Sequence, residues 1–450
     1  MSISRREFMR LSCYSLAAAS VANGLTRLGL INSTVHAATD YKALVCVFLF
    51  GGNDSNNMIV PYDSAAYANY ASLRSGLALP HTSLLPVAPA TGGVNYGLHP
   101  AFKNMQGLFN QQKLALLANT GVLVQPITRA QFQAGSAPSP TNLYSHADQQ
   151  SEWQTGVPVG SQNTGWAGRL ADRMSFVNSP SVFPMVASVN GSSVFATGLT
   201  SSPISVIPGS QTSFDGFYGD PVSNARLSAM QQLLTFDSGA SLIKSANNVT
   251  SQSFAVMAQL NEALASSTPL STVFPNTDIG NQLKQIAQLI QVRGALGMNR
   301  QIFFCSTGGF DTHNAELETH AQLYPNLDNA FYAFYQATAE MGVDSSVTTF
   351  THSDFSRTFQ EASGGGSDHA WGSHHFIMGS AVKGGNLYGT FPTIALGGPD
   401  DAGDEGRWIP SSSLDQYAAT LGAWFGAAPS DLAAVFPNLA NFPTSNLGFV

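Results

Sequence analysis

The sequence predicts an α/β fold with a mostly parallel central sheet and helices on both of its faces. Several short, near-continuous apolar runs are typical of central strands that are covered on both sides. Segments with helical character lie between these runs, so strands and helices alternate along the chain. With 450 residues, of which 44% are hydrophobic, the chain can bury a large core.

Five apolar runs are predicted as strands, because aliphatic, β-branched and aromatic residues dominate them and turn-forming residues follow them. These runs are residues 42–50, 113–120, 184–189, 301–305 and 347–351. In an open α/β sheet, ligands bind at the carboxyl edge of the strands. The residues that follow these strands are therefore the first place to look for a functional site.

Helices are predicted between and after the strands. Their approximate bounds are residues 100–111, 145–153, 165–174, 281–296, 315–341 and 411–425, with one or two more in 222–265. In the segment 281–296, Leu283, Ile286, Leu289 and Ile290 lie on one helical face. The final helix can be capped by one of its three leading serines and is followed by Gly426.

The segment from about 195 to 278 differs from the rest of the chain. Its first part is rich in Ser, Pro and Gly without clear periodicity, its middle is helical, and its end reads as a linker. We expect an insertion or cap beside the main sheet. The predicted organisation is a signal peptide at 1–37 and one α/β domain at 38–450.

The first 37 residues are typical of a twin-arginine signal. Arg5 and Arg6 are followed by Phe8 and Met9, an apolar Ala-rich stretch comes next, and small residues precede Ala38. We therefore expect a periplasmic or extracellular protein, with the twin-arginine translocase as its partner during export. A signal of this kind is not a transmembrane helix, and no later run of 18 apolar residues suggests one.

Charge and cysteine usage exclude some classes of function. The signal carries four arginines against one glutamate, so its removal takes the formal net charge from −8 to −11. A mature chain this acidic argues against nucleic acid or an anionic membrane as a partner. Cys13 leaves with the signal, and Cys46 and Cys305 lie in apolar runs, which favours two buried thiols over a disulfide or a metal site.

Acidic residues and histidines follow three of the predicted strands. Because the ends of neighbouring parallel strands meet, these side chains should come together around a metal ion. The nitrogen and oxygen ligands suit zinc, manganese or iron. The candidate ligands are Asp54 after the first strand, Asp311 and His313 after the fourth, and Asp354, Asp368, His369, His374 and His375 after the fifth.

Three further residues are candidates for catalysis. Ser145 stands at a predicted helix start, where it is either a plain N-cap or a nucleophile. His146 follows it as a general acid/base or a helix-capping residue. Arg357, or alternatively Arg169, could hold the oxygens of an anionic substrate or form a structural salt bridge.

Several motifs together resemble one known family of exported proteins. They are the twin-arginine signal, FLFGGNDSNN, YSHADQQSEWQTG, GGFDTH, SDFSRT, GSDHAWGSHHFIMG with VKGG, and GRWIPSSSLDQYAATLGAWFG. In this order they resemble the domain of unknown function 1501 family, which is placed in the alkaline phosphatase and sulfatase superfamily. The resemblance covers nearly all of the mature chain. It implies a three-layer α/β/α sandwich with an alkaline phosphatase-like fold and one or two divalent ions: zinc, manganese or calcium.

The resemblance also implies roles for single residues. Asp54 matches the first-strand metal ligand, Asp311 with His313 matches a ligand pair, and Ser145 is the best match for the nucleophile. Asp354 stands where the superfamily usually has Asp-His or Asp-Asn, and here Phe follows it. His369, with Asp368 and either His374 or His375, matches the late ligand.

The leading hypothesis is an exported metal-dependent hydrolase of phosphate or sulfate esters in small molecules or polymers. Two other classes remain open. One is a non-catalytic binding or assembly protein on the same fold, and the other is a phosphotransferase or mutase.

Overall fold

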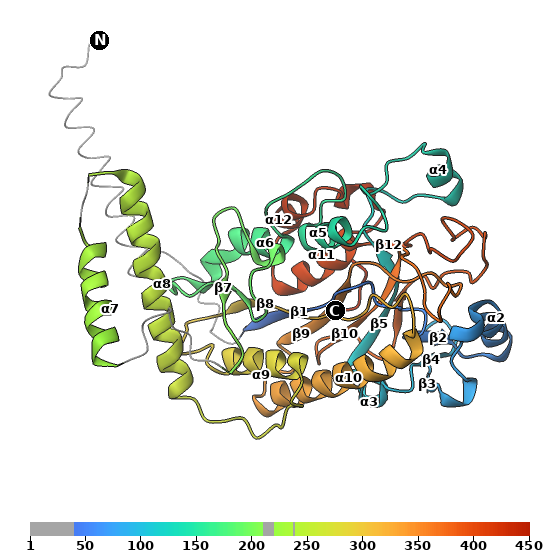
Figure 1. Cartoon of the computed structure of the whole chain (residues 1–450), viewed down its shortest axis with the longest axis horizontal. Helices are drawn as coiled ribbons and strands as arrows, with labels where there is room; N and C mark the ends of the chain where they lie inside the picture. Colours follow the sequence, from blue (N-terminus) through green and yellow to red (C-terminus); the bar gives the residue numbers. More distant parts are fainter. Residues whose placement is uncertain (1–39, 210–219, 237–238) are drawn as a thin grey trace, which may run out of the picture. The chain divides into compact units, whose positions relative to one another are not determined.

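The computed structural model describes residues 40–209, 220–236 and 239–450. The predicted signal peptide, with its arginine pair and Cys13, lies outside the described residues. Residues 42–450 form one compact unit around a large sheet (Figure 1). Cys46 and Cys305 are both buried free thiols, as predicted. Within the described ranges, we find no helix that is both long and apolar enough to cross a lipid bilayer.

Three parallel strands form the centre of the sheet, and the apolar runs predicted all of them. Strand β1 (Lys42–Leu49) lies between β8 (Arg300–Thr307) and β9 (Val347–Ser353) and is parallel to both. Leu49, the last residue of β1, pairs with Thr307 on one side and with Ser353 on the other. The carboxyl ends of the three strands are therefore level with one another.

The sheet continues on both sides of this centre in the order β11-β5-β10-β9-β1-β8-β6-β7, with β12 paired to β5. The remaining strands are β5 (Leu114–Gly121), β6 (Val186–Ser188), β7 (Ile204–Ser205), β10 (Ser373–Met378), β11 (Leu387–Gly389) and β12 (Ser412–Ser413). Strand β10 is antiparallel to both of its neighbours, and the other pairings in this sheet are parallel. The predicted fold class, α/β with a mostly parallel sheet, is confirmed.

Helices cover both faces of the sheet, which gives the three layers that were predicted (Figure 1). One face carries α3 (Lys103–Asn110), α9 (Asp278–Gln291) and α10 (Glu316–Glu340), and the other carries α5 (His146–Thr155), α6 (Trp166–Met174), α11 (Leu414–Phe425) and α12 (Pro429–Val435). A short helix, α4 (Arg129–Ala134), follows β5. The segment predicted as an insertion contains α7 (Pro221–Leu234) and α8 (Ser241–Ala265).

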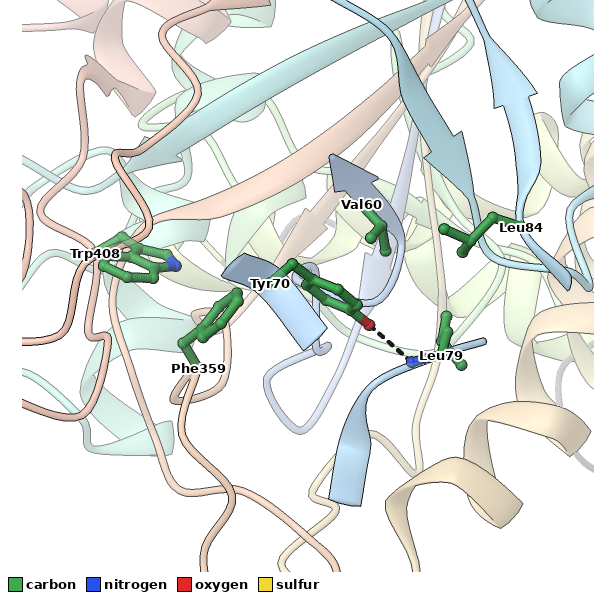
Figure 2. Close-up of a cluster of buried hydrophobic side chains, with 6 residues drawn as sticks. All are labelled: Val60, Tyr70, Leu79, Leu84, Phe359 and Trp408. Carbon is green, nitrogen blue, oxygen red and sulfur yellow. Dashed lines mark hydrogen bonds between the residues drawn. The ribbon is translucent and has the colours of Figure 1, made fainter. Parts of the chain in front are cut away.

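A smaller sheet and one helix form a separate apolar cluster beside the loop that follows β9. The sheet contains β2 (Ile59–Pro61), β3 (Leu85–Val87) and β4 (Tyr96–Leu98), and the helix is α2 (Ser64–Arg74). Figure 2 shows Tyr70 of α2 among Val60, Leu79, Leu84, Phe359 and Trp408. The Tyr70 hydroxyl accepts a hydrogen bond from the Leu79 amide at 3.0 Å. This cluster fixes α2 against the loop that contains Phe359.

Candidate metal centre

Four side-chain atoms from three segments of the chain converge at the carboxyl edge of the sheet. They are the Nε2 atoms of His146, His313 and His369 and the Oδ1 atom of Asp311. The three nitrogens lie 3.3, 3.1 and 3.4 Å from the carboxylate oxygen, and the Nε2 atoms of His313 and His369 are 2.9 Å apart. Four atoms bonded to a tetrahedral zinc ion are about 3.3 Å apart. The ligand atoms of His146, Asp311 and His369 all lie within 4.8 Å of one another and could hold a single small cation, and His313 adjoins Asp311 and His369.

Two of the imidazoles are oriented by a carboxylate at their other nitrogen. Nδ1 of His146 is 2.7 Å from Oδ2 of Asp354, and Nδ1 of His313 is 3.1 Å from Oδ1 of Asp368. A carboxylate in this position keeps the proton on Nδ1 and leaves the Nε2 lone pair free for a metal. Asp354 and Asp368, both predicted as ligands, hold two of the histidines in place instead.

His369 is oriented in the same way by a backbone carbonyl. Its Nδ1 lies 2.7 Å from the oxygen of Tyr144, so Nδ1 donates and Nε2 carries the lone pair. Two lone pairs at 2.9 Å, on His313 and His369, repel each other unless a positive charge lies between them. Nε2 of His146 is buried without a hydrogen-bond partner among the described residues. These features fit a donor set built for a cation.

The pKa values show how the environment acts on the cluster. Hydrogen bonding to Asp354 raises the pKa of His146, so a proton and a metal compete for its Nε2. Burial would raise the pKa of Asp311, but the hydrogen bond and charge of Arg357 outweigh it and the net shift is downward. Burial lowers the pKa of His369, which favours the neutral form that binds metals.

Arg357 supports Asp311 and does not reach into solvent. Its side chain is fully buried, Nη1 donates to Oδ1 of Asp311 at 2.9 Å, and Nη2 donates to the carbonyl of Ser367 at 2.6 Å. The alternative residue, Arg169, is bonded to backbone carbonyls that include Thr155 and Val435. Neither arginine occupies the position expected of a group that grips a substrate anion.

Ser145 has the geometry of an N-cap. It precedes α5, its Oγ donates to Oδ2 of Asp148 at 2.6 Å, and it accepts from the Asp148 amide at 3.4 Å. The Ser145 hydroxyl, which would have to attack a substrate if it were the nucleophile, is therefore bonded within its own helix turn.

We expect Ser145→Ala to lower the free energy of unfolding by about 1 kcal/mol, because one orphan amide of the first turn loses its partner. Hydrolytic activity should change by no more than a few-fold, because the hydroxyl is bonded within its own helix. Chemical denaturation and steady-state kinetics measure the two effects. Loss of activity without loss of stability would restore the nucleophile interpretation.

His374 and His375 do not lie in the cluster, although both were predicted as ligands. They stand inside β10, where burial lowers the pKa of each to about 3. His374 accepts a hydrogen bond from the Asn119 amide at 2.9 Å, and His375 packs against Trp153 at a ring distance of 5.0 Å. The segment Ser-His-His was not predicted as a strand, but it begins the antiparallel strand β10 between β5 and β9.

Asp54 also lies outside the four-atom cluster. It is fully buried, and its Oδ2 is 2.5 Å from Nη2 of Arg74. It belongs to a second buried group with Glu316 and His320. The sequence interpretation missed Arg74, Glu316 and His320 and assigned His146 no ligand role. The one available signal was the spacing of Glu316 and His320, four residues apart on a predicted helix.

The sequence and the structure were compared with those of known proteins. No curated protein matches the sequence. Similar solved structures include the crystal structure of Ps i-CgsB in complex with k-i-k-neocarrahexaose, at 9% identity over 88% of this chain and 74% of that chain, with a TM-score of 0.33. They also include the PsFucS1 sulfatase from Pseudoalteromonas sp., at 10% identity over 93% of this chain and 72% of that chain, with a TM-score of 0.34.

A third is the alkaline phosphatase from the Antarctic bacterium TAB5, at 8% identity over 88% of this chain and 98% of that chain, with a TM-score of 0.30. At these scores the similarity assigns no activity or residue role to this chain. The family described as "Protein of unknown function (DUF1501)" matches residues 41–401. This match confirms the predicted resemblance, and the chain belongs to that family.

Proposed function

We propose that this protein is a metal-dependent hydrolase of sulfate or phosphate esters that works after export by the twin-arginine pathway. The observation that carries the proposal is the convergence of three imidazole nitrogens and one carboxylate oxygen at the carboxyl edge of the sheet. The side chains of Asp311 and His313 are 48% and 43% exposed, so a substrate can reach the centre from solvent. A purely structural metal site is usually closed by its ligands.

The donor set favours zinc, and manganese or iron are also compatible. Three nitrogens and one oxygen are typical zinc ligands, whereas calcium prefers oxygen alone. When bound, such an ion would polarise an ester and lower the pKa of a bound water. The chain's own residues prepare the site: Asp354 and Asp368 keep protons on Nδ1 of two ligands, and Arg357 fixes the carboxylate of Asp311.

The charges near the opening favour an ester with a single negative charge. Asp311 and Asp368 are both about half exposed, while the cation next to them, Arg357, is fully buried. Since like charges repel, these carboxylates oppose a dianionic phosphate monoester more strongly than a sulfate monoester or a phosphate diester. Within the proposed class, we therefore favour the monoanionic esters.

The test combines metal analysis with turnover of matched esters. We expect protein purified after export to contain about one equivalent of a transition metal. It should hydrolyse p-nitrophenyl sulfate or bis-p-nitrophenyl phosphate faster than p-nitrophenyl phosphate. Removal of the metal with a chelator should abolish the activity, and one added equivalent should restore it, because the imidazoles then regain the ion that they face.

Two outcomes would contradict the proposal. Protein that contains no metal and takes none up would remove the centre itself. Protein that holds the metal but turns over none of the esters would remove the hydrolase activity and favour the non-catalytic binding alternative.

A further inference from the structure

A second group of potential metal ligands lies buried near the candidate centre. Single ligand atoms of Asp54, Glu316 and His320 lie within 4.8 Å of one another, and all three side chains are buried. Neither ring nitrogen of His320 has a hydrogen-bond partner among the described residues. Burying an imidazole without hydrogen-bond partners costs free energy. The His320 imidazole lies beside the carboxylates of Asp54 and Glu316. The group therefore has the composition of a cation site.

Arg74, the last residue of α2, already places a positive charge in this group. Its Nη2 lies 2.5 Å from Oδ2 of Asp54 and 2.8 Å from Oε1 of Glu316, and all three side chains have no exposure. Its Nη1 donates to the carbonyls of Thr358 and Phe359 at 2.6 and 2.8 Å. The planar guanidinium presents its donors in a fixed fork and makes all these bonds at once.

Glu316 connects this group to the loops that carry the metal ligands. Its Oε2 accepts hydrogen bonds from the hydroxyls of Thr312, at 2.9 Å, and of Ser367. Thr312 lies between the ligands Asp311 and His313, and Ser367 comes two residues before the ligand His369. The Ser367 amide also donates to the Thr312 carbonyl at 3.1 Å. One carboxylate thus joins the two ligand loops.

Arg74 also contacts the apolar cluster around Tyr70. Phe359, whose carbonyl it binds, belongs to the apolar cluster around Tyr70 in Figure 2. Arg74 therefore links α2 to Asp54, to Glu316 and to the loop that follows Arg357. A divalent ion placed among the same carboxylates would stand beside the guanidinium, and repulsion in this dry interior would be severe.

We propose that Arg74 is the built-in cation of this second group. It acts as a positioning residue for the metal centre through Glu316, and it keeps the protein at one metal ion per chain. The inference rests on the metal centre of the proposed function but not on the hydrolysis of any ester.

The test counts zinc ions per chain and measures zinc affinity by competition with a chromogenic chelator. The wild-type protein should bind one equivalent. Arg74→Ala frees Asp54, Glu316 and His320 and should raise the count to two, and Arg74→Ala with His320→Ala should return it to one. The control is Arg169→Ala, which also removes a buried arginine bonded to backbone carbonyls and should leave the count at one.

A milder variant tests the link through Glu316 if Arg74→Ala does not fold. Ser367→Ala removes one hydroxyl from Glu316 and leaves Arg74 in place, so the count should stay at one. The zinc affinity should fall by about 10- to 100-fold, the usual effect of losing a group that orients metal ligands. Denaturation curves must show that the variant is folded.

Three results would overturn the inference. The wild-type protein could bind two equivalents of zinc and lose one of them in His320→Ala. Alternatively, a folded Arg74→Ala could still bind one equivalent, or a folded Ser367→Ala could bind zinc with unchanged affinity. None of these outcomes depends on activity. A wild-type protein that binds one zinc ion and hydrolyses nothing would contradict only the proposed function.

Discussion

His369→Ala should reduce the affinity for zinc by at least about 100-fold and abolish the proposed hydrolysis with it. His369 contributes one of three imidazole nitrogens, and its removal leaves His146, His313 and Asp311 around an incomplete site. Losing a group that only orients a ligand already costs about 10- to 100-fold, so losing the ligand itself should cost at least as much. Chelator competition and turnover of a sulfate or phosphate ester measure the two effects.

Two control variants separate this effect from a general loss of histidine. His81→Ala removes a partly buried imidazole that stacks on Tyr62, outside the cluster, and should keep both metal and activity. His374→Ala removes a buried imidazole of β10 and should cost stability while the folded protein still binds one zinc ion. If His374→Ala releases the metal and His369→Ala retains it, the ligand assignment is wrong.

Composition predicted the central strands because each is covered on both faces by helices. The runs 42–50 and 301–305 correspond to Lys42–Leu49 and Arg300–Thr307 in the structure. The same logic missed β10, Ser373–Met378, because its first three residues are polar. The side chain of His374 is buried in a contact with Asn119 of β5, 255 residues away in the sequence, and local composition does not report such contacts.

In the candidate site, too, the sequence predicted the residues at strand ends but not their contacts with distant segments. Asp311, His313 and His369 were proposed as ligands because they follow predicted strands, and the structure brings them together. Asp54 follows a strand just as closely, but Arg74 at the end of α2 binds its carboxylate. No spacing rule connects an aspartate after a strand with an arginine 20 residues later, so this ion pair could be found only in the folded chain.

His146 shows a different kind of ambiguity. Its position directly after the N-cap Ser145 predicts a helix start, and residues there often serve only the backbone. The structure directs its Nε2 to Asp311 because Asp354, at the end of β9, binds its other nitrogen. The role of this histidine therefore depends on the packing of α5 against the sheet, and not on its local sequence.

Gly366→Ala should separate the two ligand loops and weaken zinc binding by about 10- to 100-fold, an effect comparable to the loss of a ligand-orienting group. A Cβ at this position would lie 2.2 Å from the backbone carbon of His313 and 2.4 Å from the amide of Asn314. Backbone atoms cannot move aside as a side chain can, so the two loops must separate and the spacing of His313 and His369 must change. Overpacking of this kind should lower the free energy of unfolding by about 3 kcal/mol.

The neighbouring glycine provides the matched control, because its substitution by alanine lowers the stability for a different reason. Gly365 has a φ of +69° and open space where a Cβ would be, so Gly365→Ala meets no atom within 4 Å. Its cost is the left-handed backbone alone, about 1 kcal/mol, and the zinc affinity should stay at the wild-type value. If both variants bind zinc equally well, the spacing of the two loops does not set the affinity. If Gly366→Ala alone loses zinc, the close backbone contact between the loops holds the ligands at their working distance.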